Sequence, residues 1–374
     1  MYIKIAAWGI LLLGMVLLVP ANWARAEDAP RVDYIELLQG TEQSQFKRVI
    51  APRPFQFPQD HGAHPDYRLE WWYFSGNLGD SENRRYGFQL TLFRYALARG
   101  EAPGWKSPQL YVGHFAVTDQ LTNRHYGFER IGRQGAGVSG VQLNPFEAWI
   151  DGWSIKSETV DGLFPLRLEA VATAPSLGAV SLSLRLEQSK PLVLQGEEGY
   201  SPKSATPGNA SHYYSYTRLA ATGELTLGER KTRVSGSAWL DREWSSSSLD
   251  ESQAGWDWFS LQLDDGRDLM FYQLRGKSGE MDPYSKGVLV AADGRYAPIE
   301  PAEIELIPLK YWYSDDGRRY PIKWQLKMPS QGLELTVVPL IEDQEWKQRL
   351  RYWEGAVVVS GSHTGRGYLE LAGY

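Results

Sequence analysis

Apolar and polar residues alternate along most of this chain at the spacing of a β-strand, and this feature constrains the fold more than any other. In residues 181–186 the alternation puts leucines on one face and Ser or Arg on the other. Such runs are short and are separated by Gly, Asp-Gly and Pro-Gly turns, and residues 341–350 are the best helix candidate, a short one. The pattern predicts an all-β protein built as a barrel or a sandwich.

An aromatic hairpin occurs twice in the sequence. The segment WWYFSGNL begins at Trp71 and returns, after a polar turn, to Arg94, whereas WDWFSLQL begins at Trp256 and returns through an Asp-Gly turn to Arg275. Asp-Gly is a favoured turn between two antiparallel strands. The shared aromatic core indicates an internal duplication, although two amphipathic hairpins can also look alike by chance.

A duplication of this kind predicts two domains. The chain has 374 residues, which suits two domains at roughly 100–200 residues each. We expect an N-terminal domain over 56–228 and a C-terminal domain over 229–374. The boundary is placed near Gly228, in a polar stretch.

The N-terminus has the three parts of a secretory signal. Lys4 supplies the positive charge, residues 5–19 are apolar, and Ala24-Arg25-Ala26 matches a cleavage site. The apolar run is short for a membrane span, which needs roughly 20 residues, although an uncleaved anchor is the alternative. We therefore expect a cleaved signal over 1–26, a lead-in segment over 27–55, and a periplasmic or secreted protein.

Composition excludes several classes of function. The net charge is −6 with no long basic run, so nucleic acid is not an expected partner. Cysteine is absent, which excludes disulfides, thiolate nucleophiles and thiolate metal ligands. The sequence has no nucleotide-binding fingerprint and no Gly-x-Ser-x-Gly elbow, and no cofactor is expected. The 15 Trp and 21 Tyr suit strands and an apolar ligand pocket equally well.

Several longer motifs resemble one family, the carotenoid 1,2-hydratases (hydroxyneurosporene synthases) and AttH-like proteins, from about residue 55 to the C-terminus. The motifs are DHGAHP at 60–65, EWWY at 70–73, QLYVGHFAVTD at 109–119, Lys190-Pro191 with LQG at 194–196, ASHYYS at 210–215, WLDREWS at 239–245, YWEG at 352–355, and residues 367–374. The resemblance implies two lipocalin-like (calycin) barrels in tandem and an apolar lipid or isoprenoid ligand. Exported members resemble the lipid-binding branch that is labelled a predicted hydrolase.

The resemblance also implies four catalytic residues. The family pattern, His-x-aromatic and later aromatic-x-Asp, falls on His212, Tyr214, Trp239 and Asp241, with Tyr and Trp exchanged relative to the hydratases. Hydration of a double bond needs an acid that protonates carbon, and a carboxyl in an apolar pocket stays protonated. Aromatic faces can stabilise the resulting cation. The alternative is that Asp241 and its neighbours Arg242 and Glu243 form a structural ion-pair network.

Ligand contacts are expected on the aromatic strands. Glu70 and Trp72 share one face of their strand, and Trp244, Trp256 and Trp258 are further candidates. A small barrel can hold one ligand in its interior. The alternative is that a tryptophan fills the base of the barrel.

Three histidines have plainer explanations. His61 and His64, near Asp60, Asp66 and Glu70, could hold zinc, but the Gly/Pro loop does not fix one face, and we favour a hydrogen-bonded loop without metal. His114 lies within a strand, where a core histidine with hydrogen-bond partners is expected.

Three functions remain at this point. The first is an exported protein that binds an apolar lipid or isoprenoid, with an envelope transporter as its candidate partner. The second is a hydratase-like enzyme with Asp241 as general acid. The third is a hydrolase of lipid-like esters, for which the serine run at 245–248 is more plausibly a loop than a nucleophile site.

Overall fold

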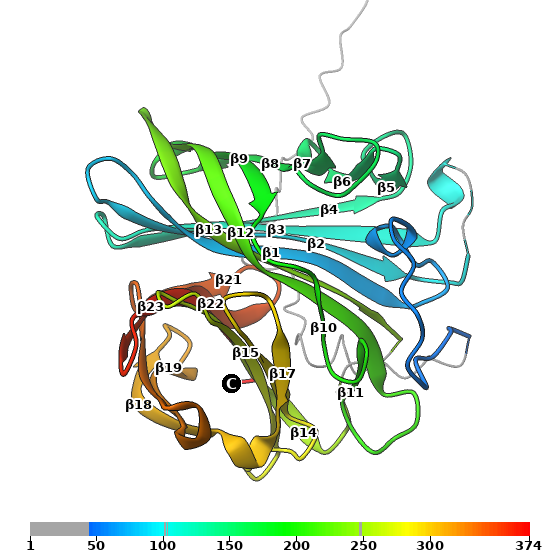
Figure 1. Ribbon diagram of the computed structural model, residues 1–374. Helices are drawn as coiled ribbons and strands as arrows, with labels where there is room; N and C mark the ends of the chain where they lie inside the picture. Colours follow the sequence, from blue (N-terminus) through cyan, green and yellow to red (C-terminus); the bar gives the residue numbers. More distant parts are fainter. Residues whose placement is uncertain (1–44, 101, 103, 247–248) are drawn as a thin grey trace, which may run out of the picture. The chain divides into compact units, whose positions relative to one another are not determined.

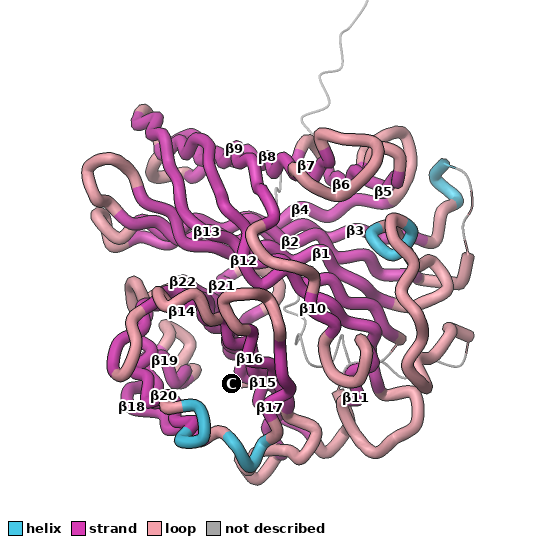
Figure 2. The backbone as a smooth tube through the Cα atoms, viewed as in Figure 1, coloured by secondary structure: helices cyan, strands magenta, loops and turns pink. Residues whose placement is uncertain are grey.

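The computed structural model describes residues 45–374 apart from 101, 103, 247 and 248, and these residues belong to one compact unit. The expected signal segment and most of the lead-in segment lie outside the described residues. Within the described part, two antiparallel sheets curl into barrel-like walls (Figure 1) and helices are confined to short 3-10 turns (Figure 2). No described helix has the length and apolar character needed to cross a membrane.

The first sheet has 13 strands. They are β1 (Leu69–Gly79), β2 (Arg85–Ala96), β3 (Gln109–Asp119), β4 (Arg124–Arg133), β5 (Ser139–Leu143), β6 (Phe146–Ile150), β7 (Trp153–Ser157), β8 (Leu166–Ala174), β9 (Gly178–Gln188), β10 (Val193–Leu194), β11 (Tyr200–Pro202), β12 (Ala210–Leu227) and β13 (Arg230–Ser245). Their order is β4-β3-β2-β1-β13-β12-β9-β8-β7-β6-β5, with β10 and β11 both paired to β12.

The second sheet has 10 strands. They are β14 (Gln253–Leu263), β15 (Asp268–Gly276), β16 (Lys286–Val290), β17 (Tyr296–Ile299), β18 (Glu305–Tyr313), β19 (Arg319–Met328), β20 (Leu333–Pro339), β21 (Glu345–Lys347), β22 (Arg351–Gly361) and β23 (Gly365–Ala372). Their order is β17-β16-β15-β14-β23-β22-β20-β19-β18, with β21 paired to β22. The short 3-10 helices are η2 (Gln59–His61), η3 (Gly104–Lys106), η4 (Pro301–Glu303) and η5 (Pro329–Gln331).

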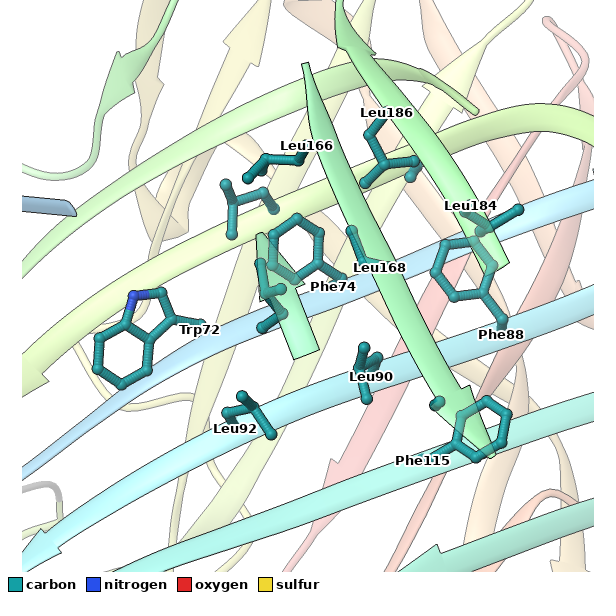
Figure 3. Close-up of a cluster of buried hydrophobic side chains, with 14 of the residues drawn as sticks. Trp72, Phe74, Phe88, Leu90, Leu92, Phe115, Leu166, Leu168, Leu184 and Leu186 are labelled. Carbon is teal, nitrogen blue, oxygen red and sulfur yellow. The ribbon is translucent and has the colours of Figure 1, made fainter. Parts of the chain in front are cut away.

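Each sheet surrounds its own apolar core. In the first sheet, Trp72 and Phe74 of β1 point inward against residues of β2, β3, β8 and β9 (Figure 3). Gly113 of β3 lets strands β6 and β7 pack closely against β3. A Cβ at this position would lie 2.8 Å from Ile150 and 2.9 Å from Trp153. In the second sheet, Phe259 belongs to an equivalent core.

The two sheets follow one scheme. In each, the first strand pairs with the second as a hairpin and with the last strand on its other side: β1 with β2 and β13, β14 with β15 and β23. Both aromatic hairpins expected from the sequence are therefore present. The two halves have the same strand order around their first strand.

Two expectations are corrected. Gly228 is not at a domain boundary, because β12 and β13 on either side of it form a hairpin within the first sheet. The chain passes between the sheets after Ser245 and before Gln253. The helix expected over 341–350 is also wrong, because Trp346 of β21 extends along β22 and stacks on His114 of the first sheet.

The outer faces of the two sheets pack against each other through β1, β2, β22 and β23. Gly87 of β2 permits this approach, because a Cβ there would lie 2.6 Å from Cβ of Ala356. The contact is partly polar: Asn77 donates to the carbonyl of Gly367 at 2.9 Å. One side of β1 thus faces a core and the other faces the second sheet.

Candidate functional site

A cavity of about 110 Å³ lies between the outer faces of the two sheets. Strands β1, β2, β12 and β13 form one wall, and β14, β15, β22 and β23 form the other. The lining side chains are Trp71, Tyr73, Gln89, Phe93, Lys203, Tyr213, Asp241, Glu243, Ser245, Leu249, Trp256, Trp258, Tyr272, Leu274, Tyr352, Glu354 and Glu370. Aromatic rings dominate the walls, and four carboxyl groups lie among them.

Strand alternation on β13 decides which side chains enter the cavity. Asp241 and Glu243 point outward into it, whereas Leu240 points into the first core. Tyr73 of β1 is directly opposite Asp241 in the strand pairing, and Ser215 of β12 is opposite it on the other side. The position of Asp241 is therefore fixed by strands on both sides.

Asp241 is a buried carboxyl that receives hydrogen bonds. Oδ1 accepts bonds from Ser215 Oγ at 2.5 Å and from Trp239 Nε1 at 2.8 Å, and Oδ2 faces the hydroxyl of Tyr213 at 2.8 Å. Burial raises the pKa of Asp241 to about 7, even though these donors oppose the rise. A buried carboxyl with such a pKa carries a proton for part of the time at neutral pH.

The bonding pattern locates that proton. An indole N–H can only donate, so Oδ1 must accept from Trp239 in either protonation state. Oδ2 accepts from the hydroxyl of Tyr213, and a proton on Oδ2 requires this hydroxyl to turn and accept instead. Tyr213 also lines the cavity, so the acidic proton lies on its border.

The second sheet contributes an equivalent acid. When the two hairpins are aligned, Trp258 corresponds to Tyr73, and Glu370 of β23 pairs with Trp258 as Asp241 pairs with Tyr73. Burial raises the pKa of Glu370 to about 7, and Trp256 donates to its Oε1 at 3.0 Å. The duplication thus places an acid at the same position in both halves.

A third acid lies beside this one. Glu354 of β22 is directly opposite Glu370 in the strand pairing. Burial and the charge of Glu370 raise the pKa of Glu354 well above its ordinary value. Its Oε1 is buried without a hydrogen-bond partner among the described residues.

The charges in the cavity do not balance. Lys203 lies 3.2 Å from Glu243, and this pair accounts for one of the four carboxyls. The other three, Asp241, Glu354 and Glu370, have no Lys, Arg or His partner within 4 Å in the described part of the chain. Carboxyl groups without a cationic partner have raised pKa values and hold protons readily. When ionised, they stabilise a positive charge that lies between them.

Of the four expected catalytic residues, Asp241 alone is among the side chains that line this cavity. His212 and Tyr214 lie on the inner face of β12, where Tyr214 bonds His61 Nδ1 at 2.7 Å and His212 packs 5.6 Å from the Trp244 ring. The register places Tyr213, not Tyr214, on the face of Asp241. Each expected pair shares a face, but the two pairs lie on opposite faces of the sheet. Trp239 donates to Asp241 from the same strand but is not itself among the side chains that line the cavity.

The five expected ligand-contact residues fall into two groups, those that line the cavity and those that are buried in the first sheet. Trp256 and Trp258 line the cavity, whereas Trp72 and Trp244 belong to the first core. Glu70 is fully buried there between Arg94 and Arg242, which donates to it at 2.5 Å. Burial alone would raise the pKa of Glu70, but the two guanidinium charges and His64 hold it well below its ordinary value. Glu70 is a structural ion-pair partner.

The histidine loop completes that ion-pair network. His64 stacks on Trp244 at 3.9 Å and lies 3.1 Å from Asp60 and 3.0 Å from Glu70, while Arg53 bonds Asp60 at 2.6 Å. Among the described residues, no group of three His, Asp or Glu has the geometry of a metal site. Ser245 lines the cavity, and no histidine is among the lining residues described.

Several residues of the site were not singled out by the sequence, among them Tyr213, Tyr352, Glu354 and Glu370. Two of them lie in the YWEG motif, which had been noted only as a family motif. Glu370 could have been found by aligning the last strand of each half. That alignment requires the strand pairing, which the sequence does not contain.

Comparison with known proteins finds relatives of this chain both by sequence and by fold. The family model described as AttH-like matches residues 48–374. A putative AttH from Nitrosomonas europaea has a crystal structure that is similar with a TM-score of 0.77 at 35% identity, over 88% of this chain and 100% of that one. Kievitone hydratase from Nectria haematococca is similar in fold, with a TM-score of 0.62 at 16% identity, over 88% of this chain and 98% of that one. A search of curated proteins gave no match.

Proposed function

This chain belongs to the AttH-like family, and from its cavity we propose that it takes up an apolar, unsaturated small molecule and adds water across a double bond. Asp241 is the acid that protonates carbon. The observation that carries this proposal is a buried carboxyl with a pKa of about 7, bordered by aromatic faces and without a cationic partner. The same fold in a hydratase relative is consistent with this chemistry.

The aromatic and acidic walls suit the intermediate of such a reaction. Protonation of a trisubstituted double bond leaves a tertiary cation, which aromatic faces attract through their quadrupoles. Trp71, Trp256 and Trp258 supply these faces. Glu354 and Glu370 add negative potential when either is ionised. The cavity therefore stabilises the cation that forms during the reaction more than it stabilises the neutral substrate.

The volume limits which part of the substrate is enclosed. An apolar cavity of about 150 Å³ holds one benzene molecule. The present cavity of about 110 Å³ therefore encloses the end of a chain, on the scale of one isoprene unit. A longer isoprenoid would extend beyond it. Probes should carry a terminal isopropylidene group, as citronellol and squalene do.

The test uses isotopes, so that it reports each bond that forms. The purified protein is incubated with citronellol or squalene in deuterium oxide enriched in oxygen-18 water. Wild type is expected to place deuterium on one carbon and oxygen-18 on the next, measured by mass spectrometry. Asp241→Asn keeps the shape and loses the acid, and should lower both labels by roughly 100- to 10,000-fold.

A matched control separates the acid from burial in general. Asp257 is also buried, which raises its pKa to about 6, but it points to Tyr374 and Arg275 and does not line the cavity. Asp257→Asn should keep both labels. If Asp241→Asn also keeps them, Asp241 is not the acid. If wild type retains the probe in native mass spectrometry but adds neither label, the protein is a binding protein without this activity.

We further propose that the protein acts outside the cytoplasm. The charged, apolar and Ala-x-Ala parts of residues 1–26 support export. The intact mass of the protein recovered from the periplasm should correspond to a chain that begins at Glu27. Retention of residues 1–26 in the exported protein would contradict cleavage.

A further inference from the structure

Glu370 lies on the opposite wall of the cavity from Asp241. Asp241 pairs with Tyr73 across β13 and β1, and Glu370 pairs with Trp258 across β23 and β14. The rings of Tyr73 and Trp258 contact each other, with their centroids 5.3 Å apart. All four side chains line the cavity. The two acids therefore belong to one cluster, to which each half of the protein contributes one acid and one ring.

One oxygen of Glu370 is held and the other is open. Trp256 donates its indole N–H to Oε1 at 3.0 Å, and an indole nitrogen can only donate, so Oε1 is an acceptor in either protonation state. Among the described residues, no side chain hydrogen-bonds Oε2. Glu370 is also partly exposed, whereas Asp241 and Glu354 are buried. Water can therefore reach the open oxygen of Glu370.

The two acids repel each other when both are ionised. Burial raises the pKa of Glu370 to about 7; the bond from Trp256 opposes this rise, and the charge of Asp241 adds to it. Burial raises the pKa of Asp241 to about 7 as well. Two such carboxyls lose their first proton more readily than their second, so near neutral pH the form with one proton between them is populated. That form contains one acid and one base.

We propose that Glu370 is the base that accepts the proton of the attacking water, an inference that rests on the proposed hydration with Asp241 as acid. Asp241 gives its proton to carbon, and the electron pair of the double bond forms the C–H bond. The water oxygen forms the C–O bond with the cation, and its proton passes to Oε2 of Glu370. Each turnover thus starts with the proton on Asp241 and ends with one on Glu370, and exchange with solvent resets the pair. The alkene and water balance the reaction.

The other charged groups of the cavity are poorer bases. The carboxylate of Glu243 is bound by Lys203 at 3.2 Å and by the hydroxyl of Ser211, which lower its affinity for a proton. Burial and the charge of Glu370 raise the pKa of Glu354 well above its ordinary value, so it already holds a proton. Burial would lower the pKa of Lys203, but Glu243 raises it, so Lys203 is an ammonium group that cannot accept a proton.

The experiment follows the two labels in one reaction, with citronellol in deuterium oxide enriched in oxygen-18 water. A cation that water does not capture returns a proton to Asp241, so deuterium still enters the alkene when the base is missing. Glu370→Gln keeps the shape and an acceptor for Trp256. It should keep deuterium exchange and lower oxygen-18 incorporation by about 100-fold. Asp241→Asn should lower both labels.

The matched control is Asp257→Asn, which removes a buried carboxyl of the second sheet that binds Tyr374 and does not line the cavity. It should keep both labels, and loss of oxygen-18 in it would show that the effect is not specific to Glu370. A Glu370→Gln variant that adds oxygen-18 at the wild-type rate would overturn the base and leave the hydration standing. Loss of both labels in this variant would also overturn the base, because Glu370 would then act before water adds. A wild type that adds neither label would contradict the hydration and the base together.

A second measurement applies if Glu370→Gln misfolds. Carbon-13 NMR titration of the glutamate carboxyls in wild type and in Asp241→Asn reports whether the two acids interact. Removal of the Asp241 charge should lower the pKa of Glu370 from its value of about 7, because Glu354, Glu243 and Lys203 remain as its charged neighbours in both proteins. An unchanged pKa would overturn the acid–base pair.

Discussion

Two buried carboxyls of the first sheet, Glu70 and Asp241, lie on the paired strands β1 and β13 but behave in opposite ways. Glu70 meets two guanidinium groups and a histidine, and its pKa is held well below its ordinary value. Asp241 meets a hydroxyl, a phenol and an indole, and burial raises its pKa to about 7. Arg242, the partner of Glu70, is the neighbour of Asp241 in sequence but points to the other face of β13. Burial alone does not decide the charge of a carboxyl; the partner that shares its face does.

The comparison predicts its largest effect on stability at Glu70. Glu70→Gln would leave Arg94 and Arg242 buried without a counter-charge, and should lower the free energy of unfolding by about 3–5 kcal/mol at pH 7. Denaturation by urea measures this. The control is Glu158→Gln, which removes an exposed carboxylate between Arg167 and Arg185 and should change stability little. A small loss for Glu70→Gln would mean that the buried pair is replaceable.

The two carboxyls should also impose opposite pH dependence on stability. The pKa of Asp241 rises from 3.8 in the unfolded chain to about 7 on folding, so its contribution is fully present below pH 4 and is lost as the pH rises to 7. Asp241→Asn should remove this slope and, above pH 7, exceed wild type in stability by on the order of 2–4 kcal/mol. For Glu70 the sign reverses, because its stabilisation is present above pH 4.5 and is lost as the pH falls. Unfolding curves between pH 4 and pH 8 measure the contribution of Asp241, and curves continued below pH 4.5 measure that of Glu70. Parallel curves for wild type and Asp241→Asn would contradict a raised pKa.

The smallest effect concerns one hydrogen bond. Trp239→Phe removes the indole N–H that donates to Oδ1 of Asp241, a bond that stabilises the ionised form. The pKa of Asp241 should therefore rise further, by about one unit. Carbon-13 NMR titration of the aspartate carboxyls measures it. Trp324→Phe, in the second core, removes an indole far from Asp241 and should leave its pKa unchanged.

The sequence predicted the class of fold and the duplicated hairpin, because strand alternation and turn residues are local signals. It also indicated Asp241 and Trp239, which lie two residues apart on one strand. It did not predict which face of β12 meets Asp241, since the register across two strands is set by packing over the whole sheet. For the same reason His212 and Tyr214 were expected at a site that they do not reach, and Glu370 was not expected at a site that it lines.

The pairing of each first strand with a last strand has a consequence for how the protein is made. β23 is the last strand along the sequence; it completes the second sheet beside β14, and it supplies Glu370. During synthesis, Asp241 and all strands of the first sheet leave the ribosome before β23 does, because β23 is near the end of the sequence. The acidic cavity is therefore assembled only when the C-terminal strand docks, and a chain that lacks this strand would have a complete first sheet but no closed second wall.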